Sequence, residues 1–304
     1  MSDRRRHGCR RASEVLVLVI GSLLLSMSTA SASLPVTNTP QLGLSGTIKT
    51  SPFVGSTTIM KDNEDIAYVP RDNSIWLVDD NADSAYEIDA VTGALKRRLS
   101  RADFEAAPLL GGGPVAGQNR TGDLEALAYD AANDILYAFS GNCCTSAALP
   151  TAFRLVRDGS GQLSIESYRA LATGSDFTAA SWNSADGKIY VGKGRAFRSY
   201  DYVTNQQGTT FRVPNVAGIL GMGFSVDGAD LFVVTNAEQL LRVNWATRSI
   251  VPGWTFGLTS FGVGDSRGVS LIGDRLYVPT ATTSGRRAIP SGTPSTSSTS
   301  SADA

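Results

Sequence analysis

Acidic residues recur at one position of a short pattern that the chain repeats five times. Four of the five copies begin with an aspartate, namely Asp62, Asp123, Asp176 and Asp265. Carboxylates held close together repel one another unless a cation or a basic side chain lies between them. Because Ca²⁺ prefers several carboxylate oxygens as ligands, the pattern predicts a site for calcium or another hard cation, with these four aspartates as metal ligands.

A second position, two residues later in the pattern, carries further charged side chains. Glu64 and Glu125 occupy it in the first two copies, and Arg267 occupies it in the fifth. We expect these three residues to bind a ligand at the same place, with Arg267 either gripping an anionic group or neutralising an acid. The alternative is structural, because an aspartate can cap the turn that enters a strand, and Arg267 can form an ion pair within the cluster.

Two adjacent cysteines, Cys143 and Cys144, form a second candidate site. In an oxidising compartment they can close a strained vicinal disulfide. Such a bond would make a rigid loop tip that contacts a ligand or responds to redox conditions. Two free thiols, or a bond to another chain, are the alternatives.

The N-terminal residues have the composition of a secretory signal. Arginines precede an apolar run over residues 15–25, and Ala30-Ser31-Ala32 follows as a small-x-small cleavage site. The apolar run is too short for a spanning helix. We therefore predict a signal peptide over residues 1–32 and a secreted or cell-surface protein, periplasmic in a Gram-negative cell, with no transmembrane anchor after cleavage.

Composition excludes several kinds of chemistry. The single histidine, His7, lies within the predicted signal peptide, so the rest of the chain has no histidine base or ligand. Ser-His-Asp catalysis, Cys-His catalysis and histidine-ligated zinc are thereby excluded. The formal net charge of −1 provides no basic field for a phosphate backbone, and we expect no nucleic-acid partner.

The repeated pattern also predicts the elements that carry these residues. In each copy a short apolar strand enters a turn rich in Asp, Asn and Gly, and a second strand follows, as in a β-hairpin. A third strand and a further turn follow the first four hairpins, so each repeat has room for four strands. Four strands at a spacing of about 40–50 residues are typical of a β-propeller blade, whereas a β-sandwich needs no motif at near-constant spacing.

We predict an all-β fold, a β-propeller with five visible repeats and five or six blades, over residues 33–288. Division of the chain length by about 45 residues per blade favours six. A strand over residues 42–48 is expected to complete the last blade and close the ring. The first strand of each blade lines the central channel, so the acids should meet at one mouth. Residues 289–304, in the Ser/Thr-rich tail, are expected to be disordered.

Two short motifs resemble those of known propeller families. Phe232-Val233-Val234-Thr235-Asn236 is similar to the second-strand signature of secreted YVTN/NHL-like propellers. Gly122-Asp123-Leu124-Glu125-Ala126-Leu127-Ala128 resembles the acidic first-strand motif of phytase-like six-bladed propellers. This resemblance implies that carboxylates at the channel mouth bind calcium. The fourth repeat departs from the phytase-like pattern, because Gly218 and Leu220 stand at its two acidic positions.

These observations favour a secreted or cell-surface propeller that acts as a binding or interaction module through its acidic channel mouth. The partner would be a protein, a glycan or a small molecule, and the protein is expected to be a monomer. The alternative is a calcium-dependent hydrolase of phosphoesters or esters, in which Asp123 and Glu125 hold an ion beside an activated water. Such an enzyme would depend on its metal and work without histidine.

Overall fold

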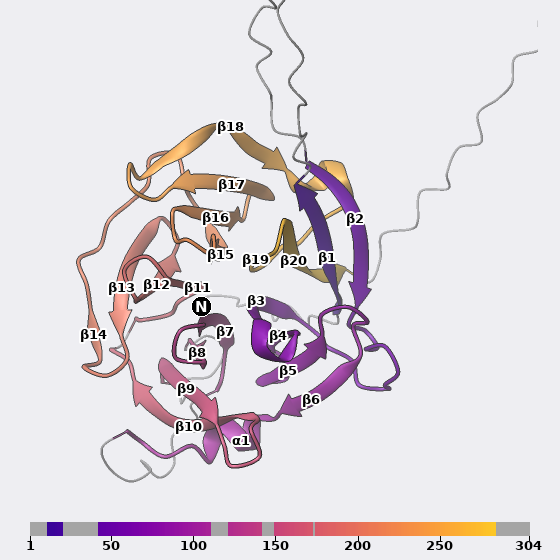
Figure 1. Cartoon of the computed structure of the whole chain (residues 1–304), viewed down its shortest axis with the longest axis vertical. Helices are drawn as coiled ribbons and strands as arrows, with labels where there is room; N and C mark the ends of the chain where they lie inside the picture. The colour runs from indigo at the N-terminus through magenta and orange to yellow at the C-terminus, as the bar shows by residue number, and fades with distance from the viewer. Residues whose placement is uncertain (1–10, 21–41, 111–120, 142–148, 173, 284–304) are drawn as a thin grey trace, which may run out of the picture.

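The structure is a computed structural model that describes residues 11–20, 42–110, 121–141, 149–172 and 174–283. Within these residues the chain forms five four-stranded antiparallel sheets that stand as blades around a ring (Figure 1). The predicted all-β propeller is therefore confirmed. Short helical segments join some of the strands: η1 (Pro70–Asp72), α1 (Arg101–Glu105) and η2 (Leu258–Phe261).

Blades 1 to 4 are meanders whose first strand lies innermost. Blade 1 contains β3 (Asn63–Val69), β4 (Ser74–Asp79), β5 (Ser84–Asp89) and β6 (Leu95–Leu99). Blade 2 contains β7 (Leu124–Asp130), β8 (Ile135–Ser140), β9 (Thr151–Arg157) and β10 (Leu163–Ala170). Blade 3 contains β11 (Ala179–Asn183), β12 (Lys188–Lys193), β13 (Ala196–Asp201) and β14 (Gln206–Gln207). Blade 4 contains β15 (Ile219–Phe224), β16 (Asp230–Thr235), β17 (Gln239–Asn244) and β18 (Ser249–Gly257).

Blade 5 joins the two ends of the described chain and closes the ring. It contains β19 (Ser270–Ile272), β20 (Arg275–Thr283), β1 (Arg11–Ile20) and β2 (Leu42–Lys49), in that spatial order. The strand expected over residues 42–48 is thus the outermost strand of the last blade, as predicted. Of the two blade counts, the described residues form five. The division by length favoured six because it counted connections such as residues 50–62 and 100–123, which lie between blades.

The backbone of residues 11–20 occupies a position that the sequence did not predict. This segment, assigned above to the signal peptide, pairs as β1 with β20 on one side and with β2 on the other. Removal of residues 1–32 after export stays a prediction. The Ser/Thr-rich tail over 289–304 and the pair Cys143 and Cys144 lie outside the described residues.

The first hairpin turns explain the recurring aromatic and Asp/Asn/Gly signature. In blades 1 and 2 the turn residues Asn73 and Asp134 adopt left-handed backbone angles, with φ of 46° and 56°. A tyrosine five residues earlier donates its hydroxyl to each of them, from Tyr68 to Asn73 Oδ1 at 3.0 Å and from Tyr129 to Asp134 Oδ1 at 2.7 Å. Short polar side chains tolerate this backbone region, so one residue both forms the turn and anchors the tyrosine.

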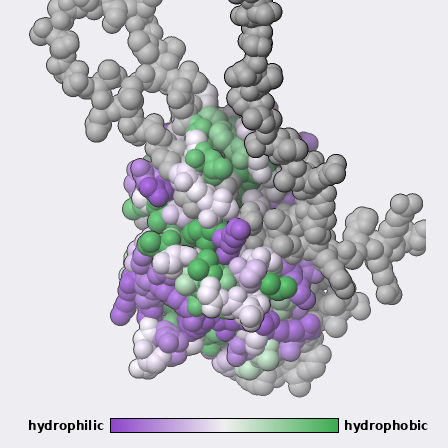
Figure 2. Space-filling model, turned by 90° about the vertical axis from the view of Figure 1, so that its right-hand side faces the viewer, coloured by the Kyte–Doolittle hydropathy of each residue, from purple (hydrophilic) through white to green (hydrophobic). Residues whose placement is uncertain are grey.

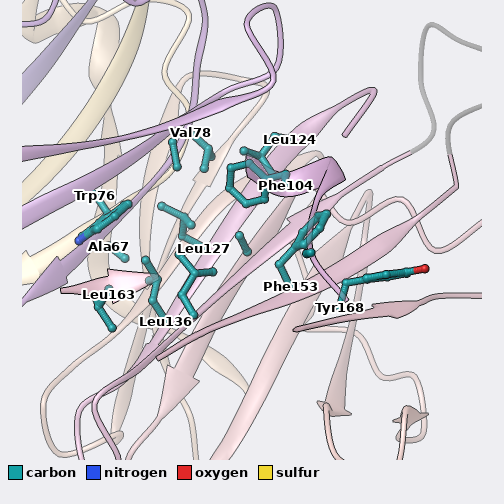
Figure 3. Close-up of a cluster of buried hydrophobic side chains, with 14 of the residues drawn as sticks. Ala67, Trp76, Val78, Phe104, Leu124, Leu127, Leu136, Phe153, Leu163 and Tyr168 are labelled. Atoms are coloured by element: carbon teal, nitrogen blue, oxygen red, sulfur yellow. The ribbon is translucent and has the colours of Figure 1, made fainter. Parts of the chain in front are cut away.

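The hydrophobic core is divided among the interfaces between blades. At the interface of blades 1 and 2, Trp76 and Val78 face Leu127 and Leu136, and α1 adds Phe104 (Figure 3). Four of these five side chains are fully buried, and Leu127 is 1% exposed. Burial of each large side chain contributes about 1.5–3 kcal/mol, so the blades hold one another mainly through these apolar faces.

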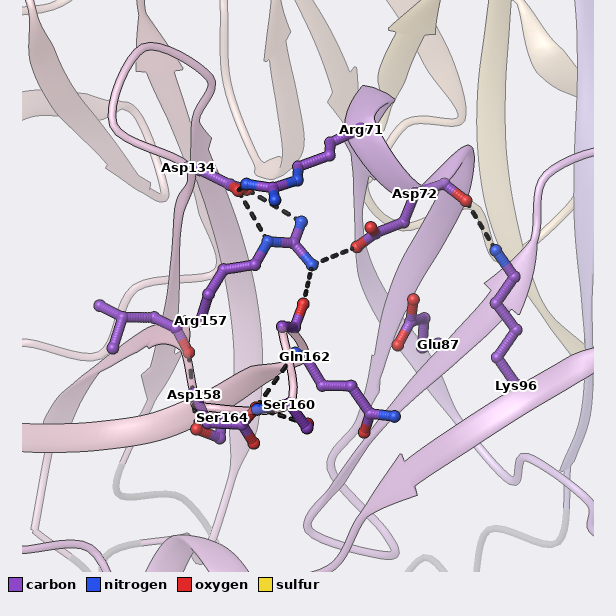
Figure 4. A network of polar contacts seen from close by, with 12 residues as sticks. Arg71, Asp72, Glu87, Lys96, Asp134, Arg157, Asp158, Ser160, Gln162 and Ser164 are labelled. Carbon is purple, nitrogen blue, oxygen red and sulfur yellow. Dashed lines mark hydrogen bonds and ion pairs between the residues drawn. The ribbon is translucent and has the colours of Figure 1, made fainter.

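Ion pairs connect blades 1 and 2 at the rim of the same interface (Figure 4). Arg157 of β9 donates to both carboxylate oxygens of Asp134, at 2.7 and 3.0 Å, and its third nitrogen lies 2.8 Å from Asp72 of blade 1. Arg71 of blade 1 reaches Asp134 at 2.9 Å. Hydrogen bonds from Arg157 are the main cause that lowers the pKa of Asp134. The network links the two blades by charge-assisted hydrogen bonds.

Outer strands carry the charged surface. Figure 2 shows the side of the ring on which β2 and β6 lie, with hydrophilic residues gathered over its lower part. On β6, Arg97 lies over the Trp76 ring at 5.0 Å and Arg98 over the Tyr86 ring at 5.6 Å, so their stems cover the blade while their charges reach solvent. In the described part of the chain, no helix is both long and apolar enough to span a bilayer.

Candidate metal centre

Two β-bulges place equivalent positions of the first two repeats at the channel. The register of β3 against β4 shifts between Asn63 and Asp65, which leaves Glu64 as the extra residue. The same shift occurs in β7 between Leu124 and Ala126, which leaves Glu125 as the extra residue. Bulges re-aim side chains at barrel and propeller rims. The two glutamates therefore leave the normal alternation of their strands at equivalent points of neighbouring blades.

The first group of acids belongs to blade 1. Side-chain oxygens of Asp62, Glu64 and Asp80 all lie within 4.8 Å of one another. Asp62 and Glu64 come from the start of the innermost strand, and Asp80 directly follows β4. Glu64 is only 7% exposed and Asp62 6%, so these carboxylates are largely withdrawn from bulk water.

The second group repeats the arrangement across blades 2 and 3. Side-chain oxygens of Asp123, Glu125 and Asp176 also lie within 4.8 Å of one another. Gly141, just after β8, packs against this group so closely that a Cβ there would overlap the carboxylates of Asp123 and Asp176. The backbone N–H of Gly141 donates to the carbonyl of Asp123 at 2.7 Å, which holds the two segments together.

The two groups interact electrostatically and are treated as one site, here called the acidic mouth. It consists of Asp62, Glu64, Asp80, Asp123, Glu125 and Asp176. Burial raises the pKa of Glu64 well above its usual range, Arg267 opposes this, and Asp80, Asp62 and Asp123 raise it further. Burial, followed by Asp123 and Glu64, likewise raises the pKa of Glu125 well above its usual range. Burial, with Asp62 next, raises the pKa of Asp80 to about 7. Glu64, Asp80 and Glu125 thus each interact with an acid of the other group, and ionisation of all six carboxylates is costly unless positive charge is supplied.

Basic side chains at the acidic mouth are few among the described residues. Arg267 lies 3.5 Å from Glu64 and 3.7 Å from Asp265, and it is partly buried. Lys193, at the end of β12, lies 3.2 Å from Asp176. Arg267 thus forms ion pairs inside the cluster, the structural alternative considered above. Two cations set against six gathered carboxylates leave a local excess of negative charge.

Asp265 stands apart from the other three predicted metal ligands. Its carboxylate faces Arg267, and it belongs to neither group of acids among the described residues. The backbone N–H groups of Asp265 and Ser266 donate to the Glu238 carboxylate at 2.9 and 3.1 Å. Asp265 adopts a left-handed backbone angle, φ 57°, at this anchored turn. The geometry therefore brings Asp62, Asp123 and Asp176 together with both glutamates and places Asp265 behind Arg267.

Asp65 forms the floor beneath the acidic mouth. It is fully buried, and its carboxylate accepts the backbone N–H of Ile66 and of Leu127, each at 2.8 Å. A further backbone hydrogen bond comes from Ala180, so one side chain of blade 1 binds the innermost strands of blades 2 and 3. On the opposite side Gly268 approaches so closely that a Cβ there would meet the side chain and backbone of Asp65. The channel is thus narrow at this level.

Sequence reasoning missed Asp80, Lys193 and Asp65. Asp80 and Lys193 belong to the second strands or their ends, which the alignment of first strands did not cover. Asp65 lies inside the first copy of the pattern, but the other copies have Ala or Gly at its position, so its role was not repeated. The adjacent acids Asp79 and Asp80 were the available signal for the additional ligand.

A larger cavity, of about 1100 Å³, lies between blades 2 and 3, and none of the residues of the acidic mouth lines it. It opens beside β14, which has only two residues and so leaves part of β13 uncovered. Two of the arginines that line it already have acidic partners, since Arg154 pairs with Glu166 and Arg157 pairs with Asp134. The acidic mouth, in contrast, has an excess of negative charge. A hard cation would therefore bind at the acidic mouth rather than in this cavity. All the acidic groups of the acidic mouth offer oxygen, the ligand type of Ca²⁺ and Mg²⁺.

Comparisons with known proteins address the fold. No family model matches the chain, and no curated protein matches its sequence. Among solved structures, the chain is similar to Myxococcus xanthus glutaminyl cyclase, with 10% identity, a TM-score of 0.47, and coverage of 69% of this chain and 86% of that one. It is also similar to Kuenenia stuttgartiensis hydrazine synthase, with 12% identity, a TM-score of 0.41, and coverage of 71% of this chain. The chain spans about half of that hydrazine synthase chain (53%). The protein is a β-propeller, and likeness at these identities concerns the fold alone.

Proposed function

We propose that this protein is an exported β-propeller binding module that holds a hard divalent cation, calcium first of all, at its acidic mouth. The observation that carries the proposal is the convergence of two groups of three carboxylates, each within 4.8 Å, from segments far apart in the sequence. A bound cation would supply the positive charge that Arg267 and Lys193 provide only in part. The cation and Arg267 together would then present positive charge to an acidic or oxygen-rich partner, such as a protein or a glycan.

Burial supports a cation over simple hydration of the acids. Glu64 is 93% withdrawn from solvent and shares its surroundings with Asp62, Asp80 and Asp123. Ionised carboxylates in such a place are stabilised when a cation is paired with them. Protonation is the other way to relieve the repulsion, and it is consistent with the raised pKa of Glu64 and Glu125. Calcium and protons should therefore compete for the same oxygens.

Calcium titration with thermal melting tests this proposal. After treatment with chelator at pH 8, added Ca²⁺ should raise the melting midpoint, because a ligand at a hundredfold excess over its Kd stabilises by about 2.7 kcal/mol. The double variant Glu64→Gln with Glu125→Gln should lose most of this shift. Glu105→Gln, a substitution of the same kind on α1 outside the acidic mouth, should keep it. A midpoint that Ca²⁺ leaves unchanged rejects the cation site.

A metal-dependent hydrolase of phosphoesters or esters is the second candidate function. The observation that favours it is the group formed by Asp123, Glu125 and Asp176, whose side-chain oxygens lie within 4.8 Å of one another. An ion held by Asp123 and Glu125 would lower the pKa of a bound water and so supply the nucleophile of such a hydrolysis. Turnover of generic phosphoester and ester substrates with calcium present, and its loss in Glu125→Gln, would support this candidate. Absence of turnover in the calcium-loaded protein, or full activity of the variant, would reject it.

A further inference from the structure

The innermost strands end at a second mouth that is chemically opposite to the acidic one. All five of them line a cavity of about 190 Å³ there. Each contributes one large side chain, four residues after the position of Glu64 in the repeat. These side chains, which define the aromatic mouth, are Tyr68, Tyr129, Trp182, Phe224 and Leu271. Four residues of strand span roughly 13 Å, so the layer of Asp65 separates the two mouths.

The rings of the aromatic mouth are held in place before any ligand arrives. The hydroxyls of Tyr68 and Tyr129 donate outward to Asn73 and Asp134, which fixes both phenol rings. Phe224 packs edge-on against Trp245, with ring centroids 4.7 Å apart and an interplanar angle of 84°. Rings that are already ordered lose little conformational freedom on binding, so the mouth is preorganised.

The wall of this cavity is neutral, and its polar groups largely form hydrogen bonds within the protein. None of the described residues that line it carries a charged side chain. Ser184 donates to the carbonyl of Val226 at 2.5 Å, and Ser181 accepts the backbone N–H of Phe224 at 3.1 Å. A ligand that needs several hydrogen bonds would find few here. Tyr68, Tyr129 and Trp182 are each partly exposed, so part of each of these side chains is accessible at the cavity.

The chemistry of the wall of the aromatic mouth favours a positive ligand. Aromatic faces attract cations, and a small cavity with several of them suits a cation that has no N–H groups to satisfy.

We propose that the aromatic mouth binds a quaternary ammonium group, of the kind carried by choline and betaines. The methyl groups would contact the apolar side chains, and the positive charge would lie against the rings of Tyr68, Tyr129 and Trp182. An inorganic cation would gain little there because the wall offers few oxygen ligands in place of its water. The site differs from the acidic mouth in position and in chemistry, so it does not depend on the calcium proposal.

Isothermal titration with choline and with 3,3-dimethylbutan-1-ol, its uncharged isostere, tests the proposal. Choline should bind saturably and the isostere about tenfold more weakly, because only choline gains the attraction of a cation to the rings. Trp182→Leu should weaken choline binding about tenfold. Phe256→Leu, a matched change at a partly exposed ring of β18, should leave binding unchanged. Thermal melting of both variants checks that they are folded.

A gain-of-function variant keeps the test decisive if Trp182→Leu fails to fold. Leu271→Phe adds a fifth ring to the mouth and should tighten choline binding without changing the affinity for the isostere by the same factor. Absence of saturable choline binding to the wild-type protein would overturn the proposal. Equal affinities for choline and its isostere, or an equal loss in Phe256→Leu, would also overturn it.

Discussion

Substitution of Asp65 by asparagine perturbs the centre of the propeller with almost no change in volume. The Asp65 carboxylate accepts N–H groups from Ile66 and Leu127 at 2.8 Å and a further one from Ala180. Asparagine keeps one oxygen acceptor, and its NH₂ group would replace the other oxygen. That NH₂ group would face the backbone N–H of Ile66 or that of Leu127, depending on which oxygen it replaces. The substitution therefore leaves buried donors without an acceptor in the middle of the ring.

The magnitude follows from the number of donors. Each buried group left without a partner costs about 1–3 kcal/mol, so the loss of one or two acceptor contacts amounts to about 1–6 kcal/mol. Part of this loss is offset, because burial raises the pKa of Asp65 well above its usual range and so makes its charge costly in the native state. We expect a net loss of about 3 kcal/mol, a large fraction of the 5–15 kcal/mol typical of native proteins.

Urea denaturation of the wild-type protein and of Asp65→Asn measures this difference in free energy of unfolding. Asp158→Asn is the matched control, since Asp158 also accepts backbone N–H groups, from Ser160 and Gln162, but in an exposed turn. It should lose less than about 1 kcal/mol because asparagine also forms such turns. If Asp65→Asn unfolds at the same urea concentration as the control, the role of Asp65 in joining three blades is refuted.

Two further predictions concern the acids and the N-terminal strand. Burial raises the pKa of Asp79 to about 6 and that of Asp80 to about 7, against an ordinary 3.8, so in chelator the stability that is complete below about pH 4 should be lost as pH rises through 6 to 7. The loss is on the order of 3–4 kcal/mol per group, and a melting midpoint in EDTA that stays level or rises from pH 5 to pH 8 would contradict it. Cleavage after residue 32 would remove β1, so hydrogen exchange of β20 amides should be faster in a 33–304 chain than in the full chain. Equal protection in both chains would show that another segment pairs with β20.

Much of the fold could be predicted from the sequence because each repeat carries the same pattern of strand and turn residues. A tyrosine followed five residues later by a left-handed Asn or Asp predicts where the first hairpin turns in blades 1 and 2. The count of blades was harder, since strands and connections contribute equally to length. The role of β1 could not be predicted, because an apolar run behind arginines has the same composition whether it is a signal peptide or a strand.

The candidate site was predictable in part for a similar physical reason. Alignment of the repeats placed Asp62, Asp123 and Asp176 at one mouth because equivalent positions of innermost strands surround one axis. It could not separate Asp265 from them, since the ion pair with Arg267 and the anchoring by Glu238 are contacts between segments of different blades. Asp80 was missed because its position follows a second strand, and only the folded hairpin brings it beside Asp62.

The two mouths show how one repeat can encode two different sites on a single axis. A strand residue and the one four positions later lie at opposite ends of the same innermost strand, so acids at the first position and aromatic rings at the second segregate without any long-range signal. Asp65, between them, links three strands by backbone hydrogen bonds and keeps the ends apart. A ligand at one mouth therefore meets oxygen and charge, whereas a ligand at the other meets aromatic and aliphatic surface. Occupation of the two sites should be independent unless the layer of Asp65 shifts.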